Sequence, residues 1–503
     1  MPPKALGKNG DGDIEKLLGF MDRHSGAERL ADRALRCLRL LAEPDRAVMW
    51  EGKTITPLSK PVLARALADA GRVDEARGLG DAVQEWLDVQ LQYATGDRAE
   101  GLKIEGMLMK TAIRAAVEEV SWGDMAAEAE RHDAKKIPGN RMMPMLVLYL
   151  CEDGNTELAG KVANKIEHRS LKEDARLCLM AGSLPVDVWA AMSGQERKFV
   201  LRELSHWFAH RGDADLMESV VRSLPMREQA SLIRHTIGVA GALHLDLAQR
   251  AIDIWATSDE RVYSGDLAAF AARRGHREVA EQTLDERHTL QTATIRLALD
   301  QDVEAFAAAI SAAALRRGPN PALVGAEAAQ ALIWLARIPG DADWIATLRE
   351  ASGRIAGFAS DMEESKNIRG EAMAVPFLKF LEGYFATLEG DAKAAKKHFG
   401  DARKAGTDKA QEAGKAKNVT TTQALALLAQ NLAEVGLPLE AYKTVKKLTA
   451  ANRSASRVYT VALSYYLRGD LMGALAAIDA AVVPNDKFAT CLGLLELSAC
   501  TSR

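Results

Sequence analysis

A recurring glycine turn constrains the fold more than any other feature of this sequence. Seven glycines each stand between two stretches in which apolar residues recur at helical spacing. These are Gly71, Gly154, Gly212, Gly275, Gly390, Gly436 and Gly469. Many helices end in one left-handed residue, a conformation that glycine adopts without steric cost. Each glycine therefore predicts a turn between two consecutive helices.

The residues around these glycines also repeat. A small residue follows most of the glycines at the fifth position: Ala76, Ala159, Ala280, Ala395, Ala441 and Ala474. Large aliphatic residues such as Leu63 and Leu428 stand eight positions before the glycine, and apolar residues such as Phe399 stand nine positions after it. Because closely crossing helices need small residues at their contact, the pattern predicts tightly packed helix pairs.

The periodicity predicts an all-α fold. Ala and Leu dominate the apolar positions and strand-like alternation is nearly absent, except that Val48 to Pro57 suits a short extended segment. A pair of short helices cannot bury its own apolar face and must stack on its neighbours, so we expect an α-solenoid of stacked antiparallel helix pairs. Weaker turns are expected near Gly123, Gly182, Leu243, Asp300 and Gly340.

The combination of a leucine, a small residue, a turn glycine, an alanine and a large apolar residue resembles the tetratricopeptide repeat family. Seven units of the chain match this pattern, and several turns are spaced slightly below the roughly 34 residues of that family. The family pattern also has an early tryptophan and a proline at the end of the second helix, and this chain lacks both at the equivalent positions. The resemblance implies a superhelix in which the first helix of each pair lines a concave, ligand-binding face.

A chain of 503 residues would ordinarily form about three domains, but the repetition predicts one jointed array. The polar stretch at 353–370 is the expected joint. The expected divisions are a disordered tail at 1–12, an N-terminal array at 13–352, the junction at 353–370 and a C-terminal array at 371–503. The amphipathic segment from Asn485 to Cys500 is expected to cap the last helix pair.

The sequence also indicates the compartment. Its five cysteines are scattered, with no CxxC spacing, which is typical of buried thiols in a reducing environment. No apolar segment follows the two lysines near the N-terminus, and the longest nearly apolar run, Met142 to Cys151, is too short for a bilayer. We therefore expect a cytoplasmic protein without a membrane span.

Charge is distributed unevenly although the formal net charge is only −4. Between Asp391 and Thr460 there are 13 Lys and Arg against six Asp and Glu. A basic end on an acidic body suits an acidic peptide, a nucleic acid or a membrane surface, whereas lysines also simply solubilise an alanine-rich helix. Without interleaved aromatic residues for base stacking, we do not expect a nucleic-acid partner.

No motif for catalysis is present, and we expect no enzyme activity, catalytic residue, cofactor or metal. Phosphate-binding loops, GxSxG elbows and dinucleotide fingerprints are all missing. The nearest approach to a metal site is Glu203, His206 and His210, which share one face of a helix. A polar, exposed helix face explains these three residues as well, and is the interpretation that we prefer.

The first-helix face suggests a partner-binding surface. Phe377, Phe380 and Tyr384 recur at i, i+3 and i+7, and Tyr459 takes a comparable place in a neighbouring unit. The expected partner-binding residues are Phe377, Phe380, Tyr384, Lys396, Lys397, Lys447 and Tyr459. The aromatic stripe would accept an amphipathic helix and the lysines its acidic flanks, unless the stripe packs inside the array.

These observations favour a non-enzymatic scaffold or adaptor that binds a protein or peptide on its concave face. The alternative is a ligand- or peptide-sensing regulator of a signalling or defence system. Both hypotheses rest on fold analogy more than on particular residues.

Overall fold

The structure is a computed structural model of the whole chain. It describes residues 11–24, 33–35, 37–39, 41, 45, 47–48, 60–131, 142–163, 194–241, 243–258, 264–285, 288–316, 322–337, 340–363, 368–415, 421–448 and 453–501. Throughout these residues the regular structure is helical, with no strand, as the periodicity predicts. Most of the expected extended segment, Val48 to Pro57, and residues 1–10 of the expected tail lie outside the described residues.

The chain divides into two compact units. The terminal unit comprises Gly7–His210 together with Pro484–Arg503, and the central unit comprises Arg211–Val483. The terminal unit contains α1 (Asp11–Met21), α4 (Lys60–Asp69), α5 (Val73–Leu91), α6 (Asp97–Ala116), α7 (Trp122–Glu130), α8 (Met142–Glu152), α9 (Thr156–Ala163), nearly all of α12 (Gly194–Arg211) and α28 (Pro484–Thr501).

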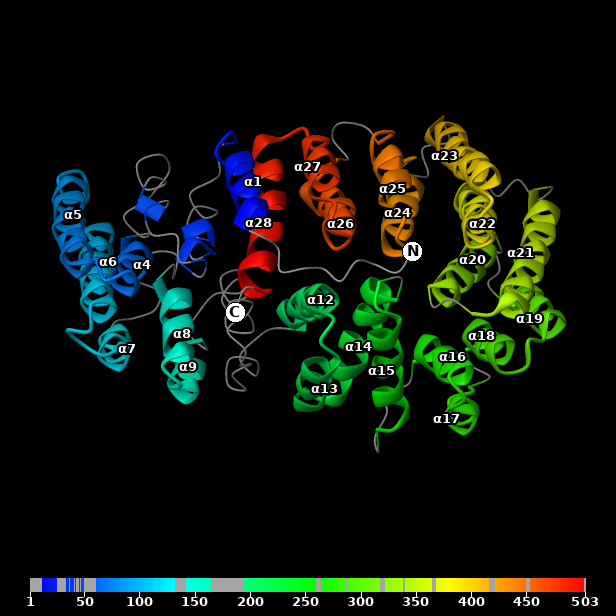
Figure 1. The fold of residues 1–503 in the computed structure, drawn as a ribbon, viewed down its shortest axis with the longest axis horizontal. Helices are drawn as coiled ribbons and strands as arrows, with labels where there is room; N and C mark the ends of the chain where they lie inside the picture. Colours follow the sequence, from blue (N-terminus) through cyan, green and yellow to red (C-terminus); the bar gives the residue numbers. More distant parts are fainter. Residues whose placement is uncertain are drawn as a thin grey trace. The chain divides into compact units, whose positions relative to one another are not determined.

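The central unit is a succession of helices (Figure 1). It contains α13 (Ala214–Ser223), α14 (Met226–Ala240), α15 (Leu245–Ala256), α16 (Gly265–Arg273), α17 (Arg277–Gln282), α18 (Thr289–Asp300), α19 (Val303–Arg316), α20 (Ala322–Ala336), α21 (Ala342–Glu363), α22 (Ile368–Leu388), α23 (Ala392–Lys415), α24 (Thr421–Glu434), α25 (Pro438–Val445), α26 (Ala455–Tyr466) and α27 (Leu471–Asp479).

All seven predicted turn glycines adopt the left-handed conformation, with positive φ angles. Gly390, for example, has φ 80° and ends α22. The residue after it, Asp391, donates its N–H to the carbonyl of Ala386 at 2.9 Å, and the turn at Gly436 is closed in the same way. These bonds satisfy carbonyls that the end of a helix would otherwise leave without a partner.

The small and large residues flanking the turns are buried as predicted. Ala395 and Phe399 are 6% and 3% exposed. A Cβ atom on Gly383 of α22 would lie 2.6 Å from the Phe399 ring of α23, so these two helices pack as closely as they do only because this position has no side chain. The other five predicted alanines are likewise buried.

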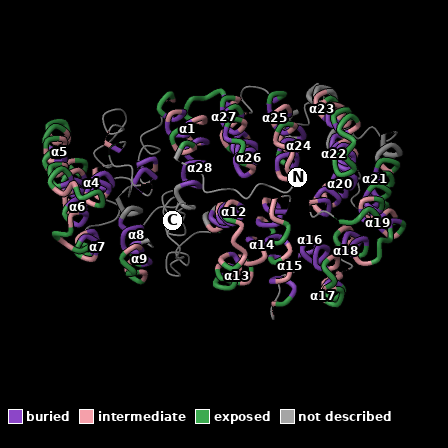
Figure 2. Tube along the Cα trace, in the orientation of Figure 1, coloured by how far each residue is buried: buried purple, intermediate pink, exposed green. Residues whose placement is uncertain are grey.

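Helices that follow each other in sequence pack together, and so do alternate helices. In the central unit α16 packs on α17, α18 on α19, and α22 on α23. Alternate helices contact each other as well, because α16 packs on α18 and α20 on α22. Figure 2 shows buried and exposed residues on most of these helices, as expected for helices with one packed face.

Three of the five weaker turn predictions fall between helices: Leu243 between α14 and α15, Asp300 at the end of α18, and Gly340 before α21. The turn expected near Gly123 lies slightly earlier in the chain, between Ala116 and Trp122, and Gly123 itself is in the first turn of α7. The left-handed residue of that connection is Glu118, with φ 62°. Gly182 lies outside the described residues.

The C-terminal helix packs against the N-terminal one. In the terminal unit α28 lies beside α1 (Figure 1), and the Cys491 thiol donates to the Leu17 carbonyl at 3.4 Å. Arg33 binds Glu496 of α28 through two hydrogen bonds of 2.8 and 2.7 Å. The segment expected to cap the last helix pair therefore packs on the beginning of the chain.

The division between the units also differs from the expected junction at 353–370. Residues 353–363 belong to α21 and residues 368–370 begin α22, and these two helices pack against each other within the central unit. Residues 11 and 12 of the expected tail are helical. None of the described helices is both long and apolar enough to cross a membrane.

We predict that Gly390→Ala lowers the free energy of unfolding by about 1 to 2 kcal/mol, because a Cβ atom is disfavoured at φ 80°. The matched control is Gly400→Ala inside α23, where a Cβ would meet nothing within 4 Å. There, alanine should stabilise the helix by about 0.5 to 1 kcal/mol. Urea unfolding followed by circular dichroism measures both changes, and equal effects of the two substitutions would contradict the turn assignment.

We also predict that Glu496→Gln destabilises the terminal unit by about 3 kcal/mol, because it removes a carboxylate charge that the largely buried Arg33 guanidinium binds. The two side chains are only 14% and 4% exposed. Glu157→Gln, which breaks an exposed pair with Lys161 on α9, should leave thermal unfolding unchanged. If Glu496→Gln had no more effect than Glu157→Gln, the contact between Arg33 and α28 would be in doubt.

Candidate binding cavity

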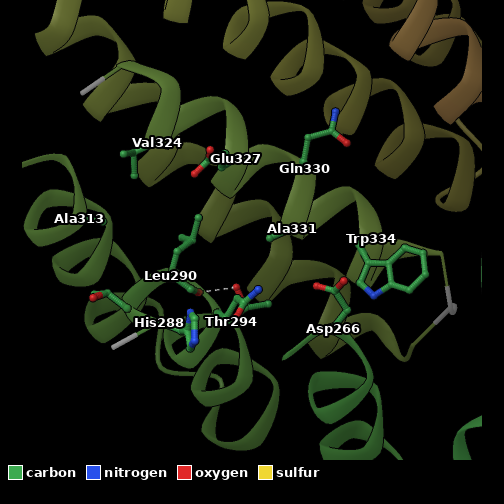
Figure 3. A pocket seen from close by; sticks show the side chains of 12 residues that line it. Asp266, His288, Leu290, Thr294, Ala313, Val324, Glu327, Gln330, Ala331 and Trp334 are labelled. Atoms are coloured by element: carbon green, nitrogen blue, oxygen red, sulfur yellow. Dashed lines mark hydrogen bonds between the residues drawn. The ribbon is translucent and has the colours of Figure 1, made fainter. Parts of the chain in front are cut away.

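The central unit contains a cavity of about 610 Å³ that opens to solvent. Its walls come chiefly from α18 and α20, and Asp266 of α16 and Ala313 of α19 complete them (Figure 3). The helices α16, α18 and α20 are the first members of successive pairs, α16 with α17, α18 with α19, and α20 with α21. A cavity of this volume falls in the range of ligand pockets, roughly 300 to 1,000 Å³.

The beginning of α18 forms the floor of the cavity, with His288, Thr289, Leu290, Gln291 and Thr294 among the lining residues. Side-chain hydrogen bonds fix this helix. The Thr294 hydroxyl donates to the Leu290 carbonyl at 2.8 Å, the bond drawn in Figure 3.

The chain before α18 is fixed in a similar way. The Thr292 hydroxyl donates to the Asp285 carbonyl at 2.7 Å, and it accepts from the Asp285 N–H at 3.2 Å. Thr292 of α18 therefore holds the residue at which the chain approaches this helix.

The helix α16 supplies Asp266 from its first turn. The Arg234 guanidinium of α14 lies 2.9 Å from this carboxylate, with side chains 48% and 35% exposed. At the preceding position, a Cβ atom on Gly265 would lie 2.9 Å from the Cβ atom of Gln291. The missing side chain lets α16 approach α18 closely enough for both to line one cavity.

The helix α20 presents Glu327, Gln330 and Trp334 at i, i+3 and i+7, in order along one face (Figure 3). The Arg337 guanidinium stacks over the Trp334 ring at 4.6 Å, and Phe270 packs against the same indole at 5.2 Å. These contacts hold the indole at the edge of the cavity.

Two nitrogen donors of this wall are buried without a hydrogen bond to any described residue: Nε2 of Gln330 and Nε1 of Trp334. A buried donor without a partner is costly, by about 1 to 3 kcal/mol, and a ligand or water that accepts from it removes this cost. Among the residues that the structure describes, the lining also includes two carboxylates, Asp266 and Glu327, and no Lys or Arg. The arrangement can therefore bind a polar ligand through hydrogen bonds and charge.

The aromatic residues expected to bind a partner are buried instead. Phe377 and Phe380 are 0% exposed, Tyr384 is 4% and Tyr459 is 8%. Phe380 contacts the rings of Tyr384 and Phe399 at centroid distances of 6.2 and 6.3 Å. Because α22 packs between α20 and α23, this stripe contributes to the core, and the expectation of an open aromatic surface is corrected.

The polar atom of Tyr384 is also directed into the protein. Its hydroxyl donates to the Ala336 carbonyl of α20 at 3.1 Å. Burial raises the pKa of this phenol to about 12. The residue thus ties α22 to the C-terminal end of α20, the helix that forms one wall of the cavity.

The three predicted lysines are exposed. Lys396 and Lys397 lie on α23, and Lys447 follows α25. These residues remain available to a partner, and nothing in their positions joins them to the cavity lining.

The metal-like group is not an exposed helix face. His206 is only 6% exposed, and its Nδ1 atom lies 3.6 Å from the Glu203 carboxylate, whose side chain is 10% exposed. No group of three or more His, Cys, Asp or Glu that could hold a metal occurs within the described parts of the chain, so Glu203, His206 and His210 do not form one. The polar, exposed interpretation of this helix is therefore wrong, because the α12 side chains are packed.

The sequence of α20 carries one signal for the cavity. Between 322 and 336 the chain is almost entirely apolar, with mean hydropathy to match, and Glu327 and Gln330 are its polar exceptions. Two polar residues and a tryptophan on one face of such a helix indicate a surface with a function beyond solubility. The sequence alone does not show that α16 and α18 supply the opposite walls.

The chain matches no protein-family model and no curated protein. Its function is therefore inferred from its own residues.

We predict that Phe380→Ala lowers the free energy of unfolding by about 3 to 5 kcal/mol, the usual cost of a large cavity in a core. Lys396→Ala, at an exposed position of the adjoining helix α23, should leave stability unchanged. Thermal unfolding of the two variants shows whether the Phe380 ring is buried or exposed. A Phe380→Ala protein as stable as the parent would indicate that the aromatic stripe lies on the surface.

Proposed function

We propose that this chain is a non-enzymatic scaffold or adaptor, an α-solenoid of tetratricopeptide-like helix pairs that binds a segment of a protein partner on its first-helix face. The observation that carries this proposal is the cavity of about 610 Å³ walled by the first helices α16, α18 and α20. In the family that the sequence resembles, the same helices line the concave, ligand-binding surface.

The chemistry of the walls supports a peptide as the ligand. A peptide presents a carbonyl at every residue, and the donors of Gln330 and Trp334 lack acceptors among the described residues. The partly exposed apolar residues Leu290 and Ala331 would contact its side chains. Such a mixture of apolar surface and a few convergent polar groups is typical of a binding site.

The lysines of the basic region add a second contact in this proposal. Lys396, Lys397 and Lys447 are exposed and would attract acidic parts of the partner outside the cavity. We propose a cytoplasmic location, on the basis of the scattered cysteines.

The proposal is tested by selecting short peptides from a random display library on the purified chain. Ala331→Trp places a large side chain in the cavity wall, and it should weaken the selected peptides by at least roughly tenfold, the effect of losing about 1.4 kcal/mol. Ala392→Trp, at an exposed position of α23, is the matched control and should leave their affinity unchanged.

Selection of no binding peptide, or of peptides that bind the Ala331→Trp variant as well as the parent, would contradict the proposed use of this cavity. Circular dichroism shows whether the Ala331→Trp protein is folded. If it is not, Thr289→Trp, at a partly exposed lining position of α18, takes its place.

A further inference from the structure

We propose that the cavity between α16, α18 and α20 receives a basic side chain, lysine or arginine, of the bound peptide. This inference rests on the proposed function, because it names the residue type that the cavity selects.

The first argument is the charge of the lining. Asp266 projects from α16 and Glu327 from α20, and the described lining residues include no Lys or Arg. The two carboxylates lie on different walls, so a cation in the cavity would be attracted from both. An acidic side chain in the same place would face two like charges, which complementary interfaces avoid. The cavity therefore favours a cation.

The second argument is that one carboxylate already binds a guanidinium from outside the cavity. Arg234 lies 2.9 Å from Asp266, and its other hydrogen bond, of 3.3 Å, goes to Ser264. Because both partners are partly exposed, this pair is weak and exchangeable. A carboxylate has two oxygens with about four acceptor positions, so Asp266 can accept from a second cation while it keeps the first.

The third argument is the shape of a basic side chain. Lysine and arginine combine a long apolar stem with a charged end. Leu290 and Ala331, which are both partly exposed, offer apolar surface for the stem, and the carboxylates of Asp266 and Glu327 offer acceptors for the end. The Gln330 side chain has a buried Nε2 donor without a described partner, and this donor suits a carbonyl of the peptide backbone.

The test uses the peptides selected on the purified chain, each compared with a version in which one arginine is replaced by citrulline, its neutral isostere. The inference predicts that cavity-dependent peptides share a basic residue and that citrulline weakens binding roughly tenfold. Glu327→Gln should cause a similar loss for the arginine peptide and almost none for the citrulline peptide, because the two changes remove the same interaction.

Glu278→Gln is the matched control, since Glu278 is an exposed glutamate of α17 outside the cavity lining, and it should affect neither peptide. Peptides that require the cavity but bind equally well with citrulline, or that lack a basic residue, would overturn this inference and leave the proposed function standing. Peptides insensitive to Ala331→Trp would overturn both.

Discussion

Close approach of neighbouring helices is the constraint on which the rest of this structure depends. It requires a turn that reverses the chain within a few residues and a contact position with little or no side chain. Gly390 provides the turn between α22 and α23, and Gly383 provides the contact, because any Cβ there would meet Phe399. The cavity also depends on a contact position without a side chain, since Gly265 lets α16 approach Gln291 of α18. The binding surface is thus a consequence of helix packing.

The local part of the fold was predictable because left-handed turns have a chemical preference. Seven turns are marked by a glycine. The connection before α7 instead has Glu118 in the left-handed conformation, which this residue type rarely adopts, so the sequence pattern placed that turn near Gly123. The packing of α28 on α1 could not be predicted from periodicity, because an amphipathic pattern shows that a face is covered and does not show which element covers it.

The candidate site illustrates the same limit. Phe380 and Tyr384 form a continuous stripe in the sequence, and a stripe of this kind fits a binding surface and a core equally well. Its burial follows from the neighbours of α22, namely α20 and α23, which are known only from the folded chain. Polar residues on an otherwise apolar helix are more informative, because burying Glu327 or Gln330 without partners would cost free energy.

The central claim is that a partner segment occupies the cavity between α16, α18 and α20. Hydrogen–deuterium exchange of the full chain, with and without a saturating selected peptide, tests it most directly, since bound segments slow the opening of the helices that they contact. The account predicts slower exchange in the first turns of α18 and along α20, with α5 and α6 of the terminal unit unchanged. Slower exchange confined to α23 and α25, with α18 and α20 unaffected, would contradict it.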